Sequence, residues 1–154
     1  MNTRLETMTA LGKPAHLADA GMLSYLVPVG RLFLAAIFIL AGPAHFVPAY
    51  IGYAAAQGAP LASVLVPASG LLASAGGLSI LLGYRARLGA AMLVLFLVPV
   101  TLIMHRFWAA PDPMTAQIQQ AMFMKNVSML GGVLLLWYFG AGPFSLDSRR
   151  ERTP

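Results

Sequence analysis

The chain has the length of one domain, 154 residues, but with 58% hydrophobic and only 10% charged residues it is neither an ordinary soluble domain nor a disordered segment. The absence of cysteine excludes disulfides, thiolate metal sites and iron–sulfur clusters within the chain. The net charge of +5 is typical of a membrane protein whose basic residues set its orientation, and it does not indicate nucleic-acid binding.

Four nearly uninterrupted apolar segments follow one another along the chain: residues 22–42, 60–82, 88–104 and 121–140. A helix that crosses a bilayer needs about 17–25 residues, and every segment falls in that range. Lipid cannot hydrogen-bond to the backbone, and the alternating pattern of barrel strands is absent, so all four are predicted to be α-helices. The predicted fold is an all-α integral membrane protein. It comprises an N-terminal arm (1–21), a four-transmembrane-helix bundle (22–147) and a basic tail (148–154).

Basic residues in the short connections predict the orientation of the bundle. One side has seven of them, and the other has Arg106 alone; the seven are Arg4, Lys13, Arg85, Arg87, Arg149, Arg150 and Arg152. The positive-inside bias therefore places both termini in the cytoplasm of a multi-pass protein of the bacterial inner membrane. The connections 43–59 and 105–120 are then expected to face outward.

Small residues recur every four positions in the second apolar segment, at Ser69, Ala73 and Gly77 and again at Gly70 and Ser74. Such spacing lets two helix backbones approach closely. It is compatible with a seam in a homo-oligomer, and equally with the general abundance of glycine in membrane helices.

Polar side chains from three predicted helices meet at one membrane depth near the outer surface. They are His45, His105, Arg106, Lys125 and Asn126. Ionisable groups inside a membrane are costly and usually face a bundle interior or a polar cavity, so these five are predicted to form a cofactor-binding site. The alternative is an interfacial role, in which His45 lies in a loop and the segment 105–108 belongs to an aromatic belt.

Two further features bear on this site. Arg31 lies toward the opposite surface and is interpreted as a structural intramembrane charge, which either snorkels to the headgroups or bonds to the terminal carbonyls of a neighbouring helix. On the fourth helix, a stripe of polar or small residues is predicted to face the bundle: Gln117, Ala121, Lys125, Ser128 and Gly132. Two histidines at helix ends and the distant Asp112 are a poor ligand set, so neither haem nor a metal site is expected.

From about residue 29 to residue 147 the chain resembles the DoxX family of small bacterial membrane proteins. The motifs that carry the resemblance are, in order, Gly30-Arg31, GPAHF (42–46), QGAP (57–60), LGYR (82–85), HRFW (105–108), FMKN (123–126), Gly131-Gly132 and GAGPFSLD (140–147). The resemblance implies a four-helix bundle whose relatives act as subunits of quinone-linked oxidoreductases, including a thiosulfate:quinone type. Other relatives assemble with thiol-handling and superoxide-handling partners.

Two functions remain open on the sequence alone. In the first, the chain is the membrane subunit of a quinone-linked oxidoreductase complex with a sulfur-related or stress-related role, and a quinone occupies the outer polar site. Quinone carbonyls accept hydrogen bonds, and histidine supplies protons near neutral pH. In the second, the chain is a non-catalytic anchor or assembly subunit of a larger complex. Both readings expect the bilayer and other membrane or membrane-associated subunits as partners.

The predicted orientation has a direct test. Alkaline phosphatase fused after Ser148 is expected to be inactive, because this enzyme folds only outside the cytoplasm, whereas an insertion near Gly52 is expected to be active. The opposite pattern of activities would reverse the topology and move the polar cluster to the cytoplasmic side.

Overall fold

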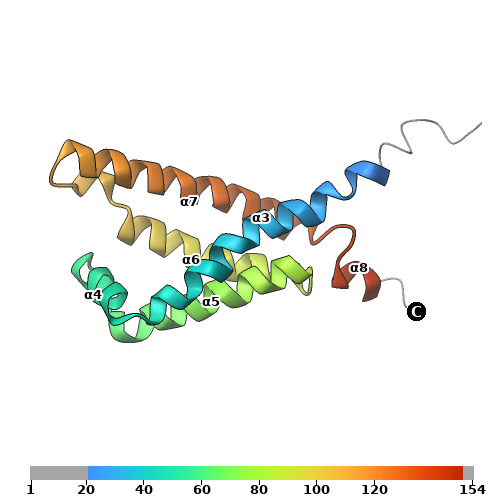
Figure 1. Ribbon diagram of the computed structural model, residues 1–154, viewed down its shortest axis with the longest axis horizontal. Helices are drawn as coiled ribbons and strands as arrows, with labels where there is room; N and C mark the ends of the chain where they lie inside the picture. Colours follow the sequence, from blue (N-terminus) through green and yellow to red (C-terminus); the bar gives the residue numbers. More distant parts are fainter. Residues whose placement is uncertain (1–20, 151–154) are drawn as a thin grey trace, which may run out of the picture.

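The computed structural model describes residues 21–150, and all of the elements it defines there are helical (Figure 1). The long helices are α3 (Leu26–Ala41), α5 (Ala62–Leu82), α6 (Ala86–Met104) and α7 (Pro113–Phe139). Shorter helical segments lie between and after them: η1 (Gly42–Phe46), α4 (Pro48–Ala56), η2 (Phe107–Ala109) and α8 (Leu146–Arg150).

The four long helices are apolar and long enough to cross a membrane, when the segments that continue α3 and α6 are included. The predicted all-α fold with four membrane-spanning helices is therefore confirmed. Of the basic residues that predict the orientation, Arg4, Lys13 and Arg152 lie outside the described residues. The cytoplasmic placement of the termini, together with the N-terminal arm and the tail as separate units, stays a prediction.

Helix α7 begins at Pro113, eight residues before the predicted start at 121. The Asp112 carboxylate accepts hydrogen bonds from the backbone N–H and the hydroxyl of Thr115, at 2.9 and 2.7 Å, and thereby caps the helix. These bonds also lower the pKa of Asp112, with the backbone bond as the larger cause. Hydropathy missed this first part of α7 because half of residues 113–120 are polar, although an Asp-Pro pair is a typical helix start.

Helices α4 and α8 mark the two ends of the molecule, referred to below as the α4 end and the α8 end (Figure 1). The connection 43–59 was expected only to face outward, but it contains η1 and α4, and Pro48 occupies the first turn of α4. Helix α4 packs against α5 and η1. It therefore covers one side of the bundle at the α4 end.

Helix α5 is the centre of the bundle and packs against both α3 and α6. A Cβ atom placed on Gly70 would lie 3.0 Å from the carbonyl oxygen of Gly42, and one placed on Gly76 would lie 3.0 Å from that of Gly89. Only glycine permits backbones to pass so closely. A Cβ placed on Gly77 would lie 3.2 Å from the carbonyl oxygen of Ala35 in α3. The small residues of α5 thus form a seam with α3 and η1 on one side and with α6 on the other, and Ala73 is also fully buried.

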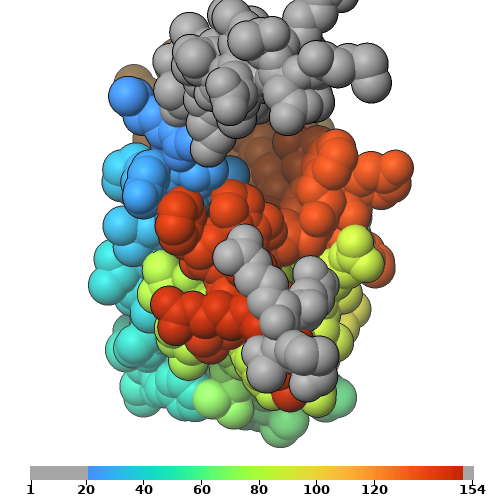
Figure 2. All heavy atoms as spheres, turned by 90° about the vertical axis from the view of Figure 1, so that its right-hand side faces the viewer, coloured from blue at the N-terminus to red at the C-terminus, as the bar shows by residue number. Residues whose placement is uncertain are grey.

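At the α8 end, a buried arginine connects α3 to the segment between α7 and α8. The Arg31 side chain of α3 is 3% exposed and donates to the carbonyl oxygens of Ala141 and Phe144, at 2.7 and 2.6 Å. In the same region the Asp147 carboxylate accepts from the backbone N–H groups of Arg85 and Ala86, at 2.7 and 2.9 Å, and so caps α6. Figure 2 faces this end and shows the segment after α7, in red, between the start of α3 and the α5–α6 junction.

The glycine seam predicts a position-specific cost of adding one methyl group. Gly76→Ala is expected to lower the free energy of unfolding by about 1–3 kcal/mol, because the new Cβ would press on Leu93 and on the backbone of Gly89. The matched control is Gly131→Ala on α7, where a Cβ would meet nothing within 4 Å, and stability should be unchanged or slightly raised. Thermal unfolding in detergent measures both; equal melting temperatures would contradict the seam.

The Arg31 contacts predict a second effect on stability. Arg31→Leu strands two carbonyl oxygens, and since a buried unsatisfied acceptor costs about 1–3 kcal/mol, a loss of about 2–4 kcal/mol is expected. Arg31→Lys should lose less, because an ammonium can still reach one of the two oxygens. Unfolding monitored by tryptophan fluorescence tests the order of the three proteins. A leucine variant as stable as the wild type would show that the contacts contribute nothing.

Candidate functional site

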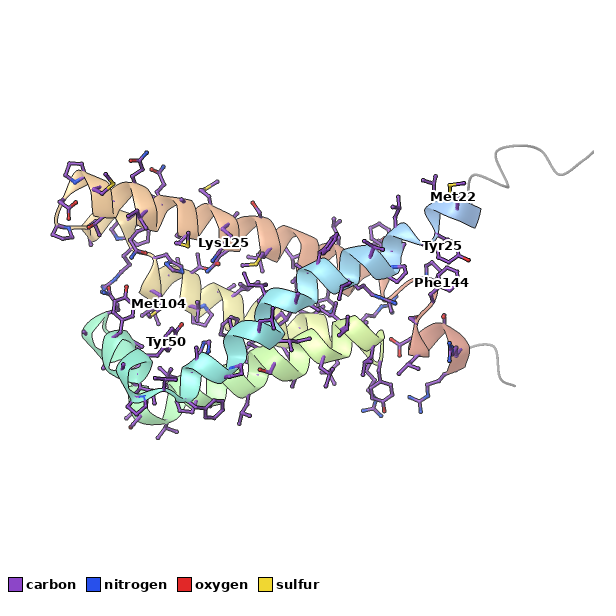
Figure 3. All side chains as sticks on the ribbon, viewed as in Figure 1. Met22, Tyr25, Tyr50, Met104, Lys125 and Phe144 are labelled. Atoms are coloured by element: carbon purple, nitrogen blue, oxygen red, sulfur yellow. The ribbon has the colours of Figure 1, made fainter. Side chains whose placement is uncertain are left out.

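A cavity of about 120 Å³ lies toward the α4 end and is lined by residues of η1 and of the helices α3 to α7. Four of the five predicted site residues line it: His45, His105, Lys125 and Asn126. Tyr50 of α4 also lines it, although it was not predicted; Figure 3 shows Tyr50 at the α4 end and Lys125 near the middle of α7. The structure therefore brings together side chains that are up to 81 positions apart in the sequence, from His45 to Asn126.

His45 is held rigidly by its neighbours and is only 5% exposed. Its Nδ1 lies 3.2 Å from the carbonyl oxygen of Ala41, and its ring packs at 4.8 Å from that of Tyr50 and 5.8 Å from that of Phe96. Because a carbonyl only accepts, this contact assigns the proton to Nδ1 and leaves Nε2 of the neutral ring as an acceptor. The close approach of Gly70 behind the side chain makes this placement possible.

Two further polar side chains contribute hydrogen-bonding groups to the cavity. His105 ends α6, and its Nδ1 pairs at 2.9 Å with Oε1 of Gln119 from the first, polar part of α7. Burial, and to a smaller extent Tyr53, raises the pKa of Tyr50, so its hydroxyl remains a donor. The sequence contains an indication of this placement, because Pro48 is typical of a helix start and Tyr50 lies in the short helix that begins there.

Asn126 contributes an amide to this cavity. The side chain is 4% exposed, and within residues 21–150 it makes no hydrogen bond. Its amide atoms are not among the fully buried unpartnered atoms of the described residues, so they line the cavity with their hydrogen-bonding capacity unused. Next to it, Lys125 Nζ contacts only the Met122 sulfur, at 3.6 Å, among the described residues. An amide and an ammonium group are therefore available to a molecule in the cavity.

A larger and almost entirely apolar hollow of about 450 Å³ adjoins this cavity, between α4, α5 and α6. The two share His45, Tyr50, Phe96 and Val100 as lining residues. Most of its other lining residues are aliphatic, among them Leu65, Leu72, Leu95, Ile103 and Met104. The α4 end thus combines a small polar cavity with an apolar space of the size that ligand pockets usually have, about 300–1,000 Å³.

One predicted site residue, Arg106, and one predicted face lie elsewhere, and Arg31 was predicted toward the opposite surface. Arg106 does not line the cavity; its Nη2 donates to the Gln57 carbonyl oxygen at 2.6 Å and connects the end of α6 to the end of α4. Arg31 lies at the α8 end, as described above. The predicted bundle-facing stripe of α7 is wrong, since four of its five members are exposed; Lys125 is one of these four, although it also lines the cavity. The buried side of α7 contains Asn126 and Val133, because α6 contacts that neighbouring face.

Comparison with known proteins decides the family. The model of the SURF4 family matches residues 61–153. The inner membrane protein YqjF of Escherichia coli (strain K12) is 33% identical over 134 residues, which cover 85% of this chain and 92% of that protein. The chain belongs to the SURF4 family.

A second SURF4-family relative is much longer. The Surfeit locus protein 4 homolog of Schizosaccharomyces pombe is 29% identical over 117 residues, which cover 74% of this chain but only 38% of that protein. No solved structure matches the chain. The family match includes His105, Lys125 and Asn126, whereas His45 and Tyr50 precede it. The similarity to an inner membrane protein, together with four helices of membrane-spanning length, confirms the predicted location in the inner membrane.

The resemblance to the DoxX family is wrong, because the family model and the relatives point to the SURF4 family. The motifs that suggested this resemblance are common features of small helical membrane proteins. They comprise glycines and prolines at helix ends, arginines in a short connection and aromatic residues at an interface, all of which lipid favours in unrelated proteins. The activities and partners implied by that resemblance lose this support.

Proposed function

We propose that the chain is a membrane subunit that binds a quinone at the α4 end, with the quinone ring in the polar cavity and the isoprenoid tail in the adjoining apolar hollow. The observation that carries the proposal is the Asn126 side chain, which is 4% exposed, lines the cavity and makes no hydrogen bond within the described residues. A quinone carbonyl is an acceptor that would satisfy this amide. Lys125 is placed to stabilise negative charge on a reduced oxygen.

The chemistry required of this chain is limited to binding and proton supply. A quinone carries its own electron chemistry, so the protein needs to supply only orientation, hydrogen bonds and protons. Tyr50 and His105 line the same cavity and hold exchangeable protons near it. Electrons would come from a partner subunit, and the chain would act within a quinone-linked oxidoreductase complex. The non-catalytic anchor or assembly subunit is the alternative function.

Quinone binding has a specific test at Asn126. Asn126→Leu removes the unpartnered amide at similar volume and is expected to weaken binding of a short-chain ubiquinone at least tenfold, about 1.4 kcal/mol. Lys125→Leu should weaken binding of the reduced form more than that of the oxidised form. The matched control is Ser128→Ala, which removes an exposed hydroxyl bonded to the Met124 carbonyl in the same helix. Binding is followed by tryptophan fluorescence in detergent micelles, and native quinone content by solvent extraction.

The outcomes separate the two functions. Each variant is first checked for a melting temperature and elution volume close to those of the wild type. Wild-type protein that carries no quinone and shows no saturable binding would eliminate the site, and the anchor function would remain. Binding that is unaffected by Asn126→Leu would place the quinone elsewhere in the bundle.

A further inference from the structure

The α8 end has a basic hollow that the proposed quinone site does not involve. It has a volume of about 640 Å³ and lies between the start of α6, the segment that follows α7, and α8. Three arginines line it: Arg85, Arg87 and Arg150. Within residues 21–150 no carboxylate lies within ion-pair distance of these three guanidinium groups. A concave surface with three such cations favours an anion with several acceptor oxygens, such as a phosphate.

Asp147 also lines the hollow, but its charge is already compensated. Both carboxylate oxygens accept backbone N–H groups at the start of α6, those of Arg85 and Ala86. The acid therefore serves as a helix cap and remains bonded when an anion approaches the arginines. The net charge of the lining residues is positive.

Arg87 lies between this basic hollow and a second, mostly apolar one. The second hollow has a volume of about 490 Å³ and is lined by Arg87, Leu134, Trp137 and Tyr138 along the last turns of α7. The Arg87 guanidinium makes one long contact, 3.4 Å from Nη2 to the Tyr138 carbonyl oxygen. A ligand held by Arg87 can therefore place an anionic group on one side and an apolar chain on the other.

The position relative to the membrane selects the kind of anion. The hollows lie where α6 begins and α7 ends, and the ends of helices long enough to span a membrane are expected at the level of the lipid headgroups. Tyr138 and Phe139 are 77% and 71% exposed there, as expected for an aromatic interfacial belt. We infer that this end binds an anionic phospholipid, whose phosphate contacts Arg85, Arg87 and Arg150 and whose acyl chain lies along α7 at Leu134 and Trp137.

The test compares lipids that differ in headgroup charge. Protein in a neutral detergent is titrated with dioleoyl phosphatidylglycerol, dioleoyl phosphatidylcholine or inorganic phosphate, and the melting temperature is recorded. Phosphatidylglycerol is expected to raise it by several degrees, and the other two by less than half as much. Equal shifts with the two lipids would overturn the proposal. A full shift with inorganic phosphate would show a simple anion site and also overturn the lipid assignment.

Variants assign the effect to the arginines. Arg87→Gln is expected to lose at least half of the phosphatidylglycerol shift, measured from the variant's own melting temperature. Arg106→Gln is the matched control, because it removes the same charge at the α4 end and should keep the full shift. If Arg87→Gln does not fold, the double variant Arg85→Gln/Arg150→Gln takes its place. A full shift in the variant used would overturn the proposed contacts.

Discussion

The close passage of α5 against α3 and α6 is the contact on which the other features depend. Helices in lipid gain little from burying apolar surface, so their association relies on backbone proximity and side-chain packing. Gly77 supplies that proximity on the α3 side of α5, and Gly76 supplies it on the α6 side. Helix α7 lacks such a contact, because a Cβ at Gly131 would meet nothing and one at Gly132 would touch only Leu34, at 3.7 Å. The bundle is therefore tight around α5 and looser beside α7, where the polar cavity lies.

Arg31 and Asn126 are both buried polar side chains, but they differ in their hydrogen bonds. Arg31 is bonded to two carbonyl oxygens that no helix partner satisfies, so its charge stabilises the segment after α7. Asn126 is equally buried but has no such partner in the described part of the chain. The Arg31 guanidinium still leaves its buried Nε without a partner. The ligand site is therefore assigned by position: Asn126 lines the polar cavity, whereas Arg31 is bonded to the segment after α7.

The sequence predicts the membrane spans well because the length of an apolar segment can be read from the chain alone. The positions of His45, His105 and Lys125 relative to the ends of these segments place them at a similar depth. The sequence does not predict which of these side chains face one another, since that depends on helix rotation, which is set by packing. Arg106 therefore leaves the site and Tyr50 enters it. The start of α7 was missed because hydropathy identifies only the apolar part of a helix that lies in lipid. The helix itself begins earlier, at the Asp112 cap, which depends on local hydrogen bonds.

The two ends of the molecule differ in the charge that they can accept. The α4 end offers one amide, one ammonium group and ring or hydroxyl groups beside an apolar hollow, which suits a neutral head with carbonyl acceptors. The α8 end offers three guanidinium groups at the membrane surface, which suits a headgroup that keeps its full charge and part of its hydration. A phosphate at the α4 end would lose that hydration against a single ammonium group, a cost that one cation does not offset. A quinone at the α8 end would leave three cations without an anion. Lipophilic ligands of opposite character are thus separated by the same bundle, because three guanidinium groups gather at the α8 end, whereas the α4 end offers one ammonium group beside an apolar hollow.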